Sequence, residues 1–129
     1  METTPDIPGA DSVTAWFGYW PSFHDAEVVE IHLNRSERSW ISLHAWDMTS
    51  ELDAQGYYVL DKHAVVTFEF EKLQGDGLAG LSPGSVILDL DVEPIESGFR
   101  LSLDPCDGPA GSFVAEHVSV SIRPGKPGR

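Results

Sequence analysis

Alternation of apolar and polar residues at every second position is the dominant pattern of the chain. It is clearest over residues 64–71, where Val66, Phe68 and Phe70 alternate with polar side chains. A period of two predicts a β-strand with one buried face. The same pattern predicts strands in five further segments and a short piece at 57–60; the five are 28–33, 39–48, 86–92, 99–103 and 113–122.

The alternation also assigns inward positions in these strands. Over 39–48 we expect Ile41, Leu43 and Ala45 to face the core. The inward residues expected for the later strands are Val86, Leu88, Leu90 and Val92, then Phe99, Leu101 and Leu103, and finally Val114, Val118, Val120 and Ile122, with Ala115 outward. Turns rich in Gly, Asn, Asp and Pro separate the segments at hairpin spacing.

One helix is predicted near the N-terminus. Asp11 or Ser12 can cap it, and it would run through Tyr19 with Val13, Trp16 and Phe17 on one side. The fold class predicted is therefore α+β, mostly β: a single curved antiparallel sheet of about six or seven strands with one short N-terminal helix. We expect one domain over residues 1–129, with loose termini at 1–10 and 124–129.

Charge narrows the range of partners. With 21 acidic and 8 basic residues, the net charge is −13, which repels phosphate backbones and argues against nucleic acid or an anionic membrane as ligand. An acidic surface favours a basic partner, although acids also simply keep small domains soluble. The only cysteine, Cys106, excludes an internal disulfide and a Cys-based zinc site. With no long apolar run, we expect a cytoplasmic protein.

The stretch from Trp20 to Val28 forms a proline-containing corner before the first strand. Its His24, Asp25 and Glu27 allow three interpretations. They could pin the corner through side-chain hydrogen bonds to the backbone, contact a partner, or contribute to a metal or acid/base site. We favour the structural interpretation.

The outward faces of the strands carry the candidate binding residues. Two tryptophans on a nominally wet face need cover, either from the helix or from a partner. The predicted partner-binding set is Trp40, His44, Trp46, Glu69, Asp89 and Asp91. The simpler alternative is that outward strand positions are merely polar.

Sequence signatures of catalysis are missing. There is no Gly-rich phosphate loop, GxSxG elbow or HExxH helix. Cys106 follows Asp104 in an acidic turn, which disfavours a reactive thiolate. We therefore expect no catalytic residue, no metal and no cofactor.

Residues 17–28, Phe-Gly-Tyr-Trp-Pro-Ser-Phe-His-Asp-Ala-Glu-Val, with the strand that follows to Leu33, resemble the opening of the Imm50 family of immunity proteins. The matching positions are Trp20, Pro21, Phe23, His24, Asp25 and Glu27. The resemblance covers about the first quarter of the chain. It implies a non-catalytic bacterial protein of a polymorphic toxin system that binds and neutralises a cognate toxin domain, and the acidic charge would suit a basic one.

Two alternatives from other classes stay open. One is a small metal-dependent enzyme that uses His24, Asp25 and Glu27 with histidines of the sheet. The other is a structural module that forms a homodimer through an exposed strand edge. An immunity protein could itself be a monomer or a homodimer.

Overall fold

The computed structural model describes residues 5–21, 23–34, 37–75, 81–106 and 111–127, without the side chains of 47–50 and 58–61. It contains one helix and seven strands over these residues. The elements are α1 (Ala10–Phe17), β1 (Glu27–His32), β2 (Arg38–Leu52), β3 (Tyr58–Glu71), β4 (Ile87–Ile95), β5 (Gly98–Pro105), β6 (Gly111–Ala115) and β7 (His117–Pro124).

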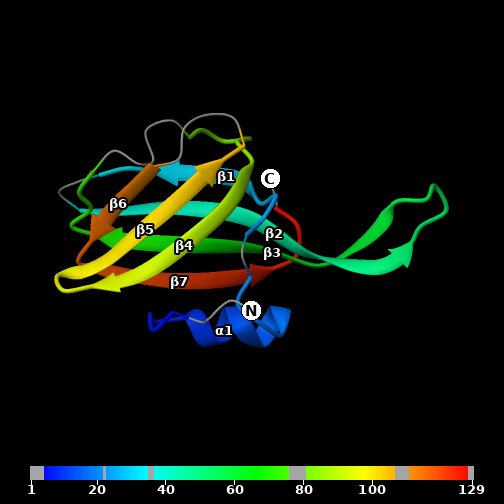
Figure 1. Cartoon of the computed structure of the whole chain (residues 1–129), viewed down its shortest axis with the longest axis horizontal. Helices are drawn as coiled ribbons and strands as arrows, with labels where there is room; N and C mark the ends of the chain where they lie inside the picture. Colours follow the sequence, from blue (N-terminus) through cyan, green and yellow to red (C-terminus); the bar gives the residue numbers. More distant parts are fainter. Residues whose placement is uncertain (1–4, 22, 35–36, 76–80, 107–110, 128–129) are drawn as a thin grey trace.

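All strand pairs are antiparallel, and the fold is α+β and mostly β, as predicted. The strands form two sheets rather than one: a four-stranded sheet in the order β1-β2-β3-β7 and a three-stranded sheet in the order β4-β5-β6. Figure 1 shows the three-stranded sheet crossing in front of the four-stranded one. Single bridges, Glu27 to Val86 and Gln74 to Val114, connect the sheets at two corners. The single curved sheet predicted from the sequence is therefore divided into two sheets that are linked by these two isolated bridges.

The hydrophobic core lies between the two sheets. Ile41, Leu43, Val66, Phe68 and Phe70 have no exposed surface, as their alternation predicts. The opposing sheet contributes Ile87, Leu90, Leu101, Leu103, Phe113 and Ala115. The predicted segments 57–60 and 64–71 form one strand, β3.

The predicted strand over 113–122 is two strands in different sheets. β6 pairs with β5, and β7 pairs with β3. Phe113 and Ala115 are buried, and so are Val118 and Val120. A straight strand cannot point odd and even residues toward the same side, so the chain breaks at Glu116 and the alternation changes phase. The outward assignment of Ala115 and the inward assignment of Val114, which is half-buried, were wrong for this reason.

The inward assignment of Leu88 was also wrong. The β4–β5 register shifts between Ile87 and Asp89, and an irregularity of this kind resets the alternation. Ile87 and Leu90 are therefore the buried residues, while Leu88 is half-buried.

Helix α1 lies along β7 at the edge of the four-stranded sheet (Figure 1). It begins at Ala10 without a side-chain cap and ends at Phe17, two residues before the predicted end, because Gly18 adopts φ +87°. In the segment expected to be loose, Ile7 is buried and the carbonyl of Pro8 accepts a hydrogen bond from the Val120 N–H at 2.9 Å. This bond covers part of the β7 edge.

Candidate functional site

The corner after α1 places two aromatic side chains, Trp20 and Phe23, in the core against Phe68 of β3. The rings of Trp20, Phe23 and Phe68 contact one another edge-on, with centroid distances of 5.6 to 6.2 Å. Trp20 and Phe23 are 5% and 3% exposed, and Pro21 is buried. Burial of this kind gives these residues a packing role.

The polar residues of the same corner face solvent. His24 Nδ1–H donates to the Leu88 carbonyl at 2.9 Å, and the Asp25 N–H donates to the Ile87 carbonyl at 2.8 Å. Asp25 adopts φ +67°, a conformation that Asp tolerates better than most residues. These bonds join the corner to β4. His24 Nε2 lies 3.6 Å from Asp25 Oδ2, yet nowhere in the described part of the chain do three or more His, Cys, Asp or Glu residues converge as a metal site would require.

The outer face of the four-stranded sheet brings together most of the predicted binding residues. Trp40, His44 and Trp46 project from β2 and are half-buried, and Glu69 lies opposite Trp40 on β3. Here and below, the outer face is the surface of the four-stranded sheet that points away from the core. Helix α1 runs along its β7 edge and leaves these residues accessible.

Two histidine–tryptophan clusters occupy the outer face. His32 stacks on Trp40 with centroids 4.2 Å apart, and the Trp40 indole N–H donates to Glu30 Oε1 at 3.2 Å. Farther along β2, His44 Nε2 and His63 Nδ1 share a hydrogen bond of 3.0 Å. The Trp46 ring packs against both histidines, with centroid distances of 4.9 Å to His44 and 6.2 Å to His63.

The His44–His63 bond requires one ring to accept through an unprotonated nitrogen. Burial lowers the pKa of His44, and the neighbouring His63 and Lys126 add to this effect, while Glu27 opposes it. His44 therefore stays neutral to lower pH than an ordinary histidine.

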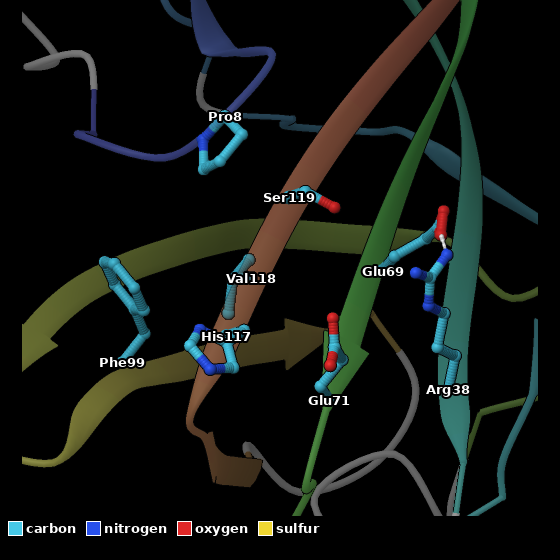
Figure 2. A pocket seen from close by; sticks show the side chains of 8 residues that line it. All are labelled: Pro8, Arg38, Glu69, Glu71, Phe99, His117, Val118 and Ser119. Carbon is cyan, nitrogen blue, oxygen red and sulfur yellow. Dashed lines mark ion pairs between the residues drawn. The ribbon is translucent and has the colours of Figure 1, made fainter.

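At the other end of the outer face, a hollow of about 410 Å³ is lined by polar and charged side chains together with Pro8, Phe99 and Val118. Figure 2 shows Glu69 and Glu71 of β3 beside His117 and Ser119 of β7. Arg38 Nη1 lies 3.5 Å from Glu69 Oε2. The hollow presents both acceptors and donors, without the enclosure of a small-molecule pocket.

Asp89 and Asp91 do not join the outer face. Both are exposed on β4, whose sheet lies on the opposite side of the core. The predicted partner-binding set is thus divided between two surfaces, since alternation shows which residues face outward but not to which sheet a strand belongs.

Sequence reasoning missed His63 and the projection of the β2–β3 hairpin. His63 is in phase with the outward residues Thr67 and Glu69, so alternation extended one step back from residue 64 could have found it. The β2–β3 hairpin projects because these two strands pair with each other beyond the residues that pair with β1 and β7. The amino-acid pattern does not show how many residues each strand pair shares.

Comparisons with family models, curated proteins and solved structures gave no match to this chain. Among the described residues, no helix is both long and apolar enough to cross a membrane.

Proposed function

We propose that this chain is an immunity-type protein, non-catalytic, that binds a cognate bacterial toxin domain and neutralises it. The observation that carries the proposal is the outer face itself. Trp40 and Trp46 are only half-buried there, outside the core, among acidic and histidine side chains. Tryptophans held at a partly wet surface are typical anchors of protein interfaces.

The resemblance to Imm50 proteins is compatible with a protein in which the motif at residues 20–27 shapes the scaffold and other residues bind the partner. Its aromatic residues Trp20 and Phe23 pack in the core, so the motif supports a proposal in which it shapes the scaffold. The binding residues proposed are then Trp40, His44, Trp46 and Glu69, on strands that the resemblance does not cover.

Charge indicates the kind of toxin. At a net charge of −13 the protein would attract a basic domain and be guided to it over distance. Toxins that cleave nucleic acid carry basic clefts, and carboxylates such as Glu69 and Glu71 could occupy the place of phosphates. Binding should then weaken as salt rises from about 0.05 to 0.5 M, because screening shortens the range of the attraction.

The test is protection by co-expression with the toxin domain encoded beside this gene, together with a binding titration of the two purified proteins. The variants Trp40→Ala and Trp46→Ala should lose affinity by about tenfold or more, as for anchor residues. Asp91→Asn, on the opposite sheet, is the control for Glu69→Gln because each removes one carboxylate. Absence of protection and of binding by the folded wild-type protein would reject the proposal, and stoichiometric zinc or manganese in that protein would favour a metal enzyme.

A further inference from the structure

The β2–β3 hairpin extends well beyond the rest of its sheet. β2 has 15 residues and β3 has 14, but β1 pairs with β2 only from Trp40 to His44, and β7 pairs with β3 only from Ala64 to Glu71. Residues 47–61, here called the arm, pair only with each other among the described strands. Figure 1 shows the arm projecting from one end of the molecule.

The strand edges of the arm differ from those of the rest of the protein, here called the body, in whether other segments bond to them. In the body, Pro8 bonds to β7, Ser85 and Gly84 bond to Val28 of β1, and Gln74 bonds to β6. These contacts cover parts of the edges that would otherwise pair with another chain. In the described part of the arm, both strands lack such a neighbour.

The base of the arm is held firmly. The β2–β3 register shifts between Ala45 and Asp47, and Lys62, opposite this point, adopts φ +53°. The Trp16 indole N–H donates to the Lys62 carbonyl at 3.0 Å, and the Gly125 N–H donates to the His63 carbonyl at 2.7 Å. A register shift of this kind can redirect the strands, and the two hydrogen bonds tie the base of the arm to α1 and to the segment after β7.

The tip has a defined turn and exposed apolar side chains. Asp53 Oδ1 accepts from the N–H groups of Gln55 and Tyr57 at 2.9 and 3.0 Å. Leu52 is 60% exposed and Tyr57 is 71% exposed, the two most exposed large hydrophobic residues described. A two-stranded ribbon without a third strand is only marginally stable in water, so a partner that covers the tip would add stability.

The charge of the arm selects the chemistry of that partner. The arm contains four acidic residues and no Lys, Arg or His; the four are Asp47, Glu51, Asp53 and Asp61. Asp47 and Asp61 are register partners at the start of the arm. A segment with this excess of acidic residues is attracted to a basic surface on a partner. A second copy of the chain would bring a further four acids to the same place, which disfavours pairing of two arms.

We propose that the arm is a docking element that enters a basic groove of the partner protein, with Leu52 and Tyr57 as apolar contacts at its tip and the acidic residues as its charged flanks. The arm continues directly from the His44–His63–Trp46 cluster, so arm and outer face form one continuous interface. This inference rests on the proposed function and identifies where the toxin domain is gripped.

The test compares binding of the toxin domain encoded beside the gene to three forms of the full chain. In the first, residues 48–60 are replaced by Asn-Gly, which joins Asp47 to Asp61 through a tight turn. The second is Leu52→Ser with Tyr57→Ser, and the third is the control Leu33→Ser, an exposed leucine beyond the opposite end of the β1–β2 pair. We expect the first two to lose affinity by about tenfold or more. The shortened form, which lacks Glu51 and Asp53, should also show a weaker salt dependence than the wild type. The control should bind as the wild type does.

Each other result overturns the inference. A shortened form that folds and binds as tightly as the wild type would remove the arm from the interface and leave the proposed function standing. If the shortened form does not fold, unchanged binding by the double serine variant would likewise remove the arm from the interface and leave the proposed function standing. A wild-type dimer that dissociates when the arm is shortened would assign the arm to a second copy. Failure of the wild type to bind would reject the proposed function and this inference together.

Discussion

The indole N–H of Trp16 in α1 donates to the main-chain carbonyl of Lys62, 46 positions away in sequence, at 3.0 Å. The helix thereby braces the base of the arm. The variant Trp16→Phe keeps an aromatic ring but removes the donor, and it should lower the free energy of unfolding by about 1 kcal/mol. Amide hydrogen exchange should accelerate at residues 45–64 more than in β5. Uniform acceleration over the protein would contradict a local bracing role.

Gly9 occupies a position that no other residue can fill. Its φ is +90°, and an added Cβ would overlap the main-chain carbonyl of Val120. Gly9→Ala should therefore disrupt the Pro8–Val120 bond and lower the melting temperature strongly. Gly56→Ala is the matched control, because φ is +87° there and the space is open; it carries only the conformational cost of about 1–2 kcal/mol. Equal losses in the two variants would show that the Val120 contact is unimportant.

Core and surface residues of the corner at 20–27 should respond differently to truncation. Phe23 is 3% exposed and contacts Trp20 and Phe68, so Phe23→Ala should cost about 3–5 kcal/mol in urea unfolding. The His24 side chain is 63% exposed and donates a hydrogen bond to the Leu88 carbonyl, and loss of such a bond costs about 1 kcal/mol, so His24→Ala should destabilise the protein by about that amount. A larger loss for His24 than for Phe23 would contradict this distinction.

The lowered pKa of His44 predicts a pH dependence of stability. Below about pH 6.5, the unfolded chain binds a proton at this residue more readily than the folded protein does. This contribution to stability is therefore complete above pH 6.5, and it is lost as the pH falls toward the folded pKa. Urea unfolding between pH 5 and 7.5 should show a steeper loss for the wild type than for His44→Gln. Parallel curves for the two proteins would contradict the assignment, since Glu27 and the other acids are common to both.

The pattern of the sequence predicted the β-rich fold and the inward faces of β2 and β3, because Ile41, Leu43, Val66 and Phe68 follow an unbroken period of two. It failed where the phase changes. At Glu116 the strand breaks between sheets, and at Leu88 a register shift resets the alternation. Both changes follow from tertiary pairing, which overrides a local pattern.

The candidate site, like the fold, was predictable from the sequence only in part. Trp40, His44, Trp46 and Glu69 were predicted as outward residues, and they share one face. Their separation from Asp89 and Asp91 required the strand order. The hydrogen bond between His44 and His63 depends on register across the hairpin, and nothing in the spacing of two histidines 19 positions apart indicates it.

The most direct measurement of the central claim is survival of cells that express the adjacent toxin domain together with this protein or with its Trp40→Ala, Trp46→Ala double variant. The proposal predicts protection by the wild type, loss of protection by the folded double variant, and continued protection by Asp91→Asn. Full protection by the double variant would remove the outer face from the interface. No protection by the folded, expressed wild type would contradict the immunity function itself.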